Sequence, residues 1–305
     1  MYKTILVPLD GSELAEGVLP YAKDISRQTK ADISLVRVVE PTTDEIKKYA
    51  KRDLISKISS KVKSESNKYF DKVRDYLKGP NVKITSNLLE GVPAVEIVSE
   101  ANKNPDTLIA MSTHGRSGVR RWMIGSVADK VVRESSVPLL LIKPKGRSPI
   151  GPEPTLKTVI VPLDESKFSE QALSHVTYLA GAMNHHVILT RVTPSAMDYA
   201  RWNSYDGVNW PVTEMSEIAG NVDEGAKEYM NALAQKLTKQ KIGSIEQALL
   251  HGDAASAIIE LASHTPNSFV AMTTRGRTGL SRTVLGSVAD RVMRHCDEPV
   301  LMIRV

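Results

Sequence analysis

Cysteine is almost absent from this chain of 305 residues, which contains only Cys296. A single cysteine cannot form an internal disulfide, and it excludes a zinc site built from several cysteines. The sequence also lacks a run of about 18 apolar residues, the length that crosses a membrane. Its first residues, MYKTILVPLD, lack the basic segment and long apolar core of a signal peptide. These absences predict a cytoplasmic protein that has no membrane partner.

Aromatic residues are scarce as well, at 5% of the chain, and 40 Lys and Arg are nearly balanced by 35 Asp and Glu. Surfaces that bind single-stranded nucleic acid interleave basic and aromatic side chains, and no stretch of this sequence does so. We therefore expect no nucleic-acid partner, despite the net charge of +5. The 41% hydrophobic and 25% charged residues are typical of a folded globular protein.

The sequence contains an internal repeat. KTILVPLD at Lys3 recurs as KTVIVPLD at Lys157, and LVRVVEP recurs at the same spacing as LTRVTP. Further along, LLEGVPAVEIVSEA matches LLHGDAASAIIELA. Between the copies lies KGRSPIGPEPT, whose Gly and Pro content is typical of a linker. The repeat predicts a first domain over residues 1–144, a linker over 145–155 and a second domain over 156–305.

Each half alternates short apolar runs with longer segments of helical spacing. TILVPL is a continuous apolar run, as expected for a strand buried on both faces, and SELAEGVLPYAKDISRQT has the apolar spacing of a helix. Five such strands per half, joined by helices, predict a doubly wound parallel sheet. Ligands of such sheets bind beyond the carboxyl ends of the strands, where the strand order reverses. The residues that follow the strands are therefore the candidates for a binding site.

One motif follows the expected fourth strand in both halves. STHGRSGVRRWMIGSVADKVV begins at Ser112, and TTRGRTGLSRTVLGSVADRVM begins at Thr273. Ser126 and Ser287 are suited to be N-caps of the helices that follow, and a helix start after a glycine offers unpaired N–H groups to an anion. Gly115 and Gly276 would let the backbone approach the anion closely, and Arg116 and Arg277 would add positive charge beside it. This pattern favours a phosphate site.

Other chemistry is poorly supported. The sequence has no P-loop motif, and Gly11 and Gly17 after the first strand have the wrong spacing for a dinucleotide fingerprint. His114 is matched by an arginine in the second copy, which argues against a required proton carrier. His185 and His186 are adjacent on a strand, so they point to opposite faces, and we expect them at the surface without a metal.

The motifs resemble those of the universal stress proteins, in a tandem form with two family domains. ATP-binding members of that family carry a glycine, two residues, a second glycine, nine residues, and then glycine with Ser or Thr. Both copies match the later part of this motif, and VPLD after the first strand adds to the match. The first family glycine is replaced by Ser112 in one copy and by Thr273 in the other.

The resemblance implies strand order 3-2-1-4-5 in each domain. The expected fold class is thus α/β, with two repeated doubly wound domains, each a five-stranded parallel sheet flanked by helices. The resemblance also implies ribose contacts at Asp10 and Asp164, adenine contacts at the backbone of Val38 and Val192, and phosphate contacts at the glycine motifs. The expected nucleotide-binding residues are Asp10, Val38, Ser112, Gly115, Arg116, Gly125, Ser126, Val127, Asp164, Val192, Thr273, Gly276, Arg277, Gly286, Ser287 and Val288.

These features predict a stress-response or signalling protein that binds ATP or another adenine nucleotide, with Mg²⁺ held through the phosphates rather than by a metal site of the protein. Bound nucleotide would regulate its conformation or its choice of partner. We expect no catalytic residues and at most slow ATP hydrolysis. Two alternatives stay open, namely a pseudo-symmetric scaffold that does not bind nucleotide and an efficient ATP-dependent enzyme.

Two regions bear on assembly. The apolar last strands, PLLLIKP at Pro138 and PVLMIRV at Pro299, would lie at a sheet edge, and an exposed edge favours pairing. We expect an intramolecular pseudo-dimer of the two domains, and a homodimer of chains is a further possibility. In the second copy, residues 195–220 carry Tyr199, Trp202, Tyr205 and Trp210, which predicts either a lid over the nucleotide, a partner surface or a loop packed on its own domain.

Overall fold

The computed structural model describes residues 1–40, 52–79, 82–115, 124–144, 156–195, 197–199, 212–240, 242–275 and 285–305. The chain divides into two compact units, Met1–Pro154 and Thr155–Val305, which we call unit 1 and unit 2. Each is described by itself. The expected linker, residues 145–155, lies outside the described residues.

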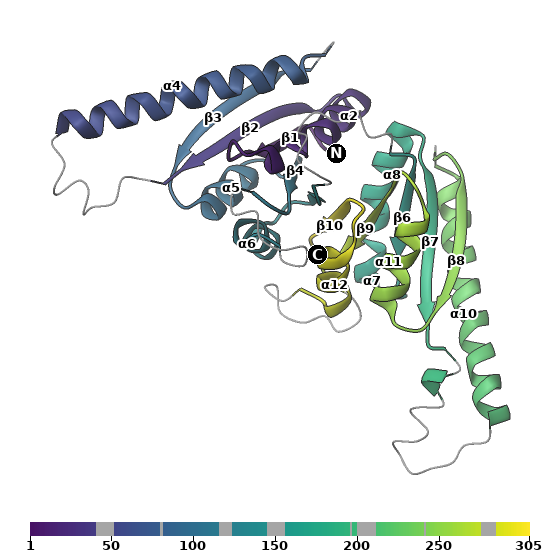
Figure 1. Ribbon diagram of the computed structural model, residues 1–305. Helices are drawn as coiled ribbons and strands as arrows, with labels where there is room; N and C mark the ends of the chain where they lie inside the picture. The colour runs from purple at the N-terminus through teal and green to yellow at the C-terminus, as the bar shows by residue number, and fades with distance from the viewer. Residues whose placement is uncertain are drawn as a thin grey trace. The chain divides into compact units, whose positions relative to one another are not determined.

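Unit 1 is a parallel five-stranded sheet covered by helices on both faces (Figure 1). Its strand order is β3-β2-β1-β4-β5, the order that the resemblance implies. Its elements are β1 (Thr4–Pro8), α1 (Glu13–Glu16), α2 (Leu19–Thr29), β2 (Asp32–Val39), α4 (Arg52–Leu77), β3 (Ile84–Glu90), α5 (Pro93–Asn102), β4 (Thr107–Ser112), α6 (Ser126–Glu134) and β5 (Leu139–Ile142).

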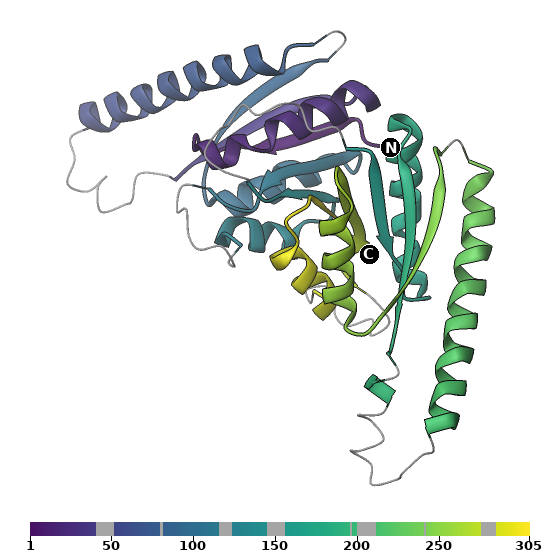
Figure 2. The ribbon, with the colours of Figure 1, turned by 45° about the vertical axis from the view of Figure 1, so that its right-hand side comes forward.

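Unit 2 repeats this architecture with the strand order β8-β7-β6-β9-β10 (Figure 2). The expected doubly wound α/β fold is therefore confirmed in both halves. Its elements are β6 (Thr158–Pro162), α7 (Lys167–Glu170), α8 (Ala172–Met183), β7 (His186–Thr193), α10 (Val212–Thr238), β8 (Ile245–His251), α11 (Ala254–His264), β9 (Ser268–Thr273), α12 (Ser287–His295) and β10 (Val300–Ile303).

Burial explains why the apolar runs form the central strands. Every residue of β4 and of β9 is buried, since helices cover both faces of a parallel sheet. The outer strand β3 instead alternates between exposed and partly buried residues. Ile5 and Leu108, on the neighbouring strands β1 and β4, are completely buried and lie opposite each other in register.

The first helical segment differs from expectation. It divides into α1 and α2 at Gly17 and Val18 instead of forming one helix. Pro20 stands in the first turn of α2. Proline has no N–H to donate to the carbonyl four residues earlier, so a helix begins at this residue more easily than it continues through it. Pro93 likewise occupies the first turn of α5.

Candidate functional site

The candidate site lies where the strand order of each unit reverses. In unit 1, β1 pairs with β2 on one side and with β4 on the other, and all three strands are parallel. The residues after β1 and β4 therefore emerge at one edge of the sheet, on neighbouring strands. Asp10 follows β1, and Ser112 is the last residue of β4. In unit 2, β6 and β9 are paired in the same way.

Asp10 and Gly115 lie against each other at this edge. One carboxylate oxygen of Asp10, Oδ1, accepts hydrogen bonds from the backbone N–H of Ser12 at 2.9 Å and from its hydroxyl at 2.6 Å. A Cβ added to Gly115 would collide with the other oxygen, Oδ2. Gly115 is thus a glycine because the carboxylate of Asp10 fills the space beside it. Arg116 lies outside the described residues.

Unit 2 repeats the carboxylate arrangement. Oδ1 of Asp164 accepts hydrogen bonds from the backbone N–H of Ser166 at 3.0 Å and from its hydroxyl at 2.6 Å. The corresponding glycine, Gly276, and the adjacent Arg277 lie outside the described residues. The short helices α1 and α7 begin directly after these serines, so each aspartate also orders the turn into the first helix.

The helices after β4 and β9 begin at the expected serines, one residue earlier than serine N-caps would place them. Gly125 is the N-cap of α6 and Gly286 the N-cap of α12, so Ser126 and Ser287 open the helices as predicted, but as first helical residues; the prediction that they are N-caps is wrong. The N-cap glycines supply no side-chain cap, and both serines are exposed. Val127 and Val288 follow them and are partly buried. The positive end of the helix dipole and the first-turn N–H groups lie here, and such a helix start favours an anion.

The glycine N-caps are held by the strand ends. The N–H of Gly125 donates to the carbonyl of Thr113 at 2.8 Å, and that of Gly286 donates to Thr274 at 2.8 Å. A Cβ on Gly125 would lie 3.2 Å from the Thr113 oxygen, a tight contact. These bonds fix each helix start beside the carboxyl end of β4 or β9.

Ser112 and Thr273 replace the first family glycine without backbone strain. Each is the last residue of a strand, and neither has a positive φ. Their hydroxyls act locally, because Ser112 Oγ accepts from the N–H of His114 at 3.3 Å and Thr273 Oγ1 donates to the carbonyl of Arg275 at 2.6 Å. A side chain at this position is therefore compatible with the fold of the loop.

The expected adenine positions lie on the second strands. Val38 is near the end of β2, in register with Leu89, and Val192 is near the end of β7, in register with Leu250. The carbonyl of Val192 accepts a hydrogen bond from Nη1 of Arg191 at 2.5 Å. In unit 2, one backbone group of the expected adenine contact is thus already engaged.

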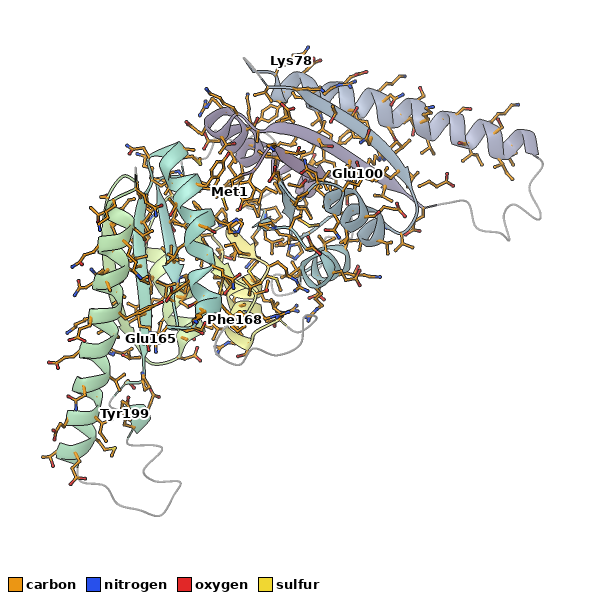
Figure 3. All side chains as sticks on the ribbon, turned by 180° about the vertical axis from the view of Figure 1, so that it is seen from behind. Met1, Lys78, Glu100, Glu165, Phe168 and Tyr199 are labelled. Atoms are coloured by element: carbon orange, nitrogen blue, oxygen red, sulfur yellow. The ribbon has the colours of Figure 1, made fainter. Side chains whose placement is uncertain are left out.

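A cluster of charged and phenolic groups beside this edge was missed by the sequence analysis. In unit 2, Nε of Arg191 donates to Glu165 at 2.8 Å, and the Tyr229 hydroxyl donates to Glu170 at 3.1 Å. Burial, and then the charge of Glu170, raises the pKa of Tyr229. Glu165, labelled in Figure 3, has the left-handed backbone conformation, with φ of 67°.

Unit 1 contains a similar cluster, in which no carboxylate stands at the position of Glu165. The Arg37 guanidinium lies over the ring of Tyr69, 5.5 Å from its centroid, and burial followed by the charge of Glu16 raises the pKa of Tyr69. Gly11 takes the place of Glu165, again with positive φ, 87°. Arg37 therefore has no carboxylate partner among the described residues. The recurrence of an arginine in LVRVVEP and LTRVTP was the available sequence signal.

Two further expectations concern histidines and aromatic residues. His185 is only 1% exposed and its ring lies 5.8 Å from that of Phe269, so the prediction of a surface position is wrong. His186 is partly exposed and contacts Glu246 at 3.0 Å. Tyr199 is largely buried, whereas Trp202, Tyr205 and Trp210 of the expected lid lie outside the described residues.

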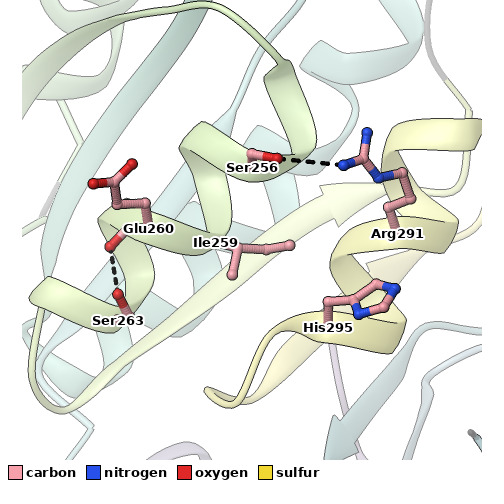
Figure 4. A pocket seen from close by; sticks show the side chains of 6 residues that line it. All are labelled: Ser256, Ile259, Glu260, Ser263, Arg291 and His295. Carbon is pink, nitrogen blue, oxygen red and sulfur yellow. Dashed lines mark hydrogen bonds between the residues drawn. The ribbon is translucent and has the colours of Figure 1, made fainter. Parts of the chain in front are cut away.

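A pocket of about 380 Å³ lies elsewhere, between α11 and α12 (Figure 4). None of its lining residues belongs to the expected nucleotide set, and Arg291 within it already bonds to Asp253 at 2.8 Å and to Ser256 at 3.3 Å. The lining residues are Ser256, Ile259, Glu260, Ser263, Arg291 and His295. Among the described residues, no group of three His, Cys, Asp or Glu side chains could hold a metal ion, and no helix is long and apolar enough to span a membrane.

Comparison with known proteins identifies the repeat. The model of the universal stress protein family matches residues 1–143 and again residues 155–304. Universal stress protein MJ0531 of Methanocaldococcus jannaschii is 33% identical over 144 residues, which cover 47% of this chain and 83% of that protein. A universal stress protein structure from Archaeoglobus fulgidus has the same fold across both units, with a TM-score of 0.63 at 21% identity, covering 100% of this chain and 99% of that one.

A universal stress protein solved in complex with cAMP is 18% identical, covering 47% of this chain and 98% of that one, with a TM-score of 0.35. The two family matches together span almost the whole sequence, and each falls within one of the compact units. The chain therefore belongs to the universal stress protein family and carries the family's domain twice.

Proposed function

We propose that each unit binds an adenine nucleotide, with ATP as the ligand, and that the bound nucleotide regulates conformation or the choice of partner in a stress response or in signalling. One observation carries the proposal. In both units, an aspartate follows the first strand and a helix with a glycine N-cap follows the fourth, and these two strands are neighbours at the switch point of the sheet. Ligands of doubly wound sheets bind at this place.

The phosphates would bind at the starts of α6 and α12, where N–H groups and the helix dipole attract anions. The ribose would contact Asp10 or Asp164, whose Oδ1 the adjacent serine holds in place. The adenine would lie by the backbone of Val38 or Val192. Mg²⁺ would be held by phosphate oxygens, because the metal prefers phosphate and water oxygens to dedicated protein cages.

The two sites differ in charge. Arg191 is paired with Glu165, whereas Arg37 has a glycine at the corresponding position. Beside its second strand, unit 1 therefore presents a positive charge that Glu165 neutralises in unit 2. We expect this charge to give unit 1 the tighter ATP site, even though Arg275 adds a charge in unit 2 where unit 1 has His114. We expect hydrolysis to be slow in both units, since His114 is replaced by Arg275 in the second copy.

Thermal melting with and without Mg-ATP tests the proposal. A ligand at 100 times its Kd stabilises the native state by about 2.7 kcal/mol, which raises Tm by several degrees in a domain of this size. AMP, cAMP and GTP in parallel identify the preferred phosphate number and base. Asp106→Ala is the matched control for Asp10→Ala, because Asp106 lies before β4, at the opposite end of the strands, and pairs with Lys3.

The absence of any shift at millimolar nucleotide would contradict the proposal and favour a scaffold that works without nucleotide. Phosphate release faster than about one per second would instead favour an ATP-dependent enzyme.

We also propose, from the apolar sequences of β5 and β10, that the two domains associate through their last strands as a pseudo-dimer. Light scattering on the separately expressed halves tests this association. Self-association of each half is expected, and halves that stay monomeric at high concentration would contradict it.

A further inference from the structure

The helices α4 and α10 are much longer than the strands they cover. They contain 26 and 27 residues, against seven in each of β3 and β8. At 1.5 Å per helical residue and about 3.3 Å per strand residue, each helix is roughly 40 Å long and each strand roughly 23 Å. In both units the N-terminal part of the helix reaches beyond the end of the sheet (Figures 1 and 2).

Burial shows where each helix leaves the body of its unit. The buried residues of α4 begin at Ser66, and those of α10 begin at Ala226. Just before Ala226, Asp223 accepts a hydrogen bond from Thr193 at 2.7 Å, which ties this part of α10 to the sheet. We call residues 54–62 the α4 overhang and residues 213–222 the α10 overhang. No side chain in either overhang is buried.

Each overhang exposes an apolar stripe. In the α4 overhang, Leu54 and Ile58 are 52% and 43% exposed, and Val62 continues the spacing of four residues. In the α10 overhang, Ile218 and Val222 are 41% and 36% exposed at the same spacing. Residues four apart lie on one face of a helix, so each pair forms an apolar stripe that stays about 36–52% exposed.

The charges beside the two stripes are opposite. The α4 overhang contains two lysines, Lys57 and Lys61, and no acidic residue, although Glu65 just beyond it lies 4.0 Å from Lys61. The α10 overhang contains two glutamates, Glu214 and Glu217, and no basic residue. Lys57 and Lys61 are themselves four residues apart and neighbour Ile58 on the helix surface, while Glu214 lies one turn before Ile218. The α4 overhang is thus complementary in charge to the α10 overhang. Two copies of the same overhang would repel each other.

The overhangs receive little stabilisation from the body of their own unit. Each extends a helix that its packed part already nucleates, so it is held mainly by the helix propensity of its own residues. The α10 overhang also contains Gly220, which costs about 1 kcal/mol relative to alanine in a helix and has no neighbouring atom within 4 Å of its Cβ position. The stability that propensity does not supply must come from contacts along the stripe.

We propose that the α4 overhang packs on the α10 overhang of a second copy of this chain. The apolar stripe of one helix would pack against that of the other, with the lysines of one helix beside the glutamates of the other. Pairing of like helices is disfavoured, because it would set lysine against lysine or glutamate against glutamate. Two copies that exchange both contacts form a closed dimer, in which each contact occurs twice.

Sedimentation velocity of the full chain tests this proposal over two decades of concentration, up to about 100 μM. The wild type is expected to rise from the mass of one chain toward two. Lys57→Glu with Lys61→Glu, or Glu214→Lys with Glu217→Lys, is expected to weaken association at least about tenfold, since like charges would then face each other. Lys236→Glu with Lys239→Glu makes the same charge change at the far end of α10 and should leave association unchanged.

Mixing the two charge-reversed proteins gives the decisive result. In the mixed pair both contacts are again between opposite charges, so association is expected to return to the wild-type level. A folding defect in either variant would not be repaired by mixing. Ile58→Ser and Ile218→Ser, which keep all charges, should each weaken association as well.

Three results would overturn the proposal: a wild type that keeps the mass of one chain throughout, association that neither reversal weakens, or a mixture that fails to associate. Loss of binding to phosphatidylserine vesicles in the Lys57→Glu, Lys61→Glu protein, without any self-association of the wild type, would assign the α4 overhang to a membrane surface instead and would equally overturn it.

Discussion

Replacing Gly115 with alanine is a direct perturbation of the candidate site. The added Cβ would lie inside 3.0 Å of Oδ2 of Asp10, a separation that real Cβ atoms essentially never show. Gly115 does not have a positive φ, so alanine introduces no backbone strain of its own. The whole effect should therefore come from the collision with the carboxylate.

The magnitude follows from what holds Asp10 in place. Its other oxygen accepts two hydrogen bonds from Ser12, at 2.9 and 2.6 Å, so the carboxylate cannot turn away without weakening them. Overpacking costs about 1–3 kcal/mol, and a hydrogen bond to a charged group contributes about 1.5–3 kcal/mol. Because the site is only partly buried, we expect the lower end, about 1–2 kcal/mol, which lowers Tm by roughly 2–8 °C for a domain of this size.

Urea unfolding in a double-mutant cycle measures this coupling. Asp10→Ala removes the carboxylate, so Gly115→Ala on that background should change stability by less than about 0.5 kcal/mol. Gly79→Ala is the control, since a Cβ there makes only an ordinary contact at 3.9 Å. The transition of unit 2 should not move. An equal loss with and without Asp10 would refute the assignment of Gly115 to this contact.

Other substitutions test local features. Lys30 ends α2 in the left-handed conformation with φ of 60°, and the equivalent Asn184 has φ of 50°; Lys30→Asn should raise, and Asn184→Lys should lower, the free energy of unfolding by about 0.5–1 kcal/mol, measured by urea denaturation. Asp253 caps α11 through the Ser256 N–H at 2.9 Å, and this bond, with Arg291 as a smaller cause, lowers the pKa of Asp253. Since the folded-state pKa lies below the unfolded one, this stabilisation is complete above the ordinary value near 3.8 and is lost as pH falls through the folded pKa. Asp253→Ala should cost about 1 kcal/mol at neutral pH and less in acid, and Asp253→Asn should keep most of the cap without the pH dependence.

The strands could be predicted because burial on both faces leaves a clear pattern, whereas their order was implied by the family resemblance. Runs such as TILVPL and TLIAMS have no polar face, so each marks a central strand of a parallel sheet. Because the sequence repeats, each strand predicted in the first half also predicts a matching strand in the second. Helix boundaries were less certain, because spacing alone does not show that Pro20 begins a second helix or that Gly125, rather than Ser126, is the N-cap.

The candidate site was predictable only where its residues follow strands. Asp10 and Gly115 are more than a hundred residues apart, yet both come directly after strands that the topology makes neighbours. The placement of Arg37 over Tyr69 could not be foreseen, because it depends on which face of α4 meets the sheet. The position of His185 was predicted wrongly, because alternation along a strand shows that adjacent side chains point to opposite faces but not which of them is buried. The ring of His185 contacts that of Phe269.

Calorimetric titration of the full chain with Mg-ATP tests the central claim most directly. The account predicts two ATP sites per chain in the wild type. Asp10→Ala and Asp164→Ala should each retain one site, at nucleotide concentrations where the altered site stays empty. The site lost in Asp10→Ala should be the tighter one. The Asp106→Ala control should retain both. If ATP binds the wild type with the same stoichiometry and affinity as it binds the protein carrying both Asp10→Ala and Asp164→Ala, nucleotide does not occupy the carboxyl ends of these strands and the account is contradicted.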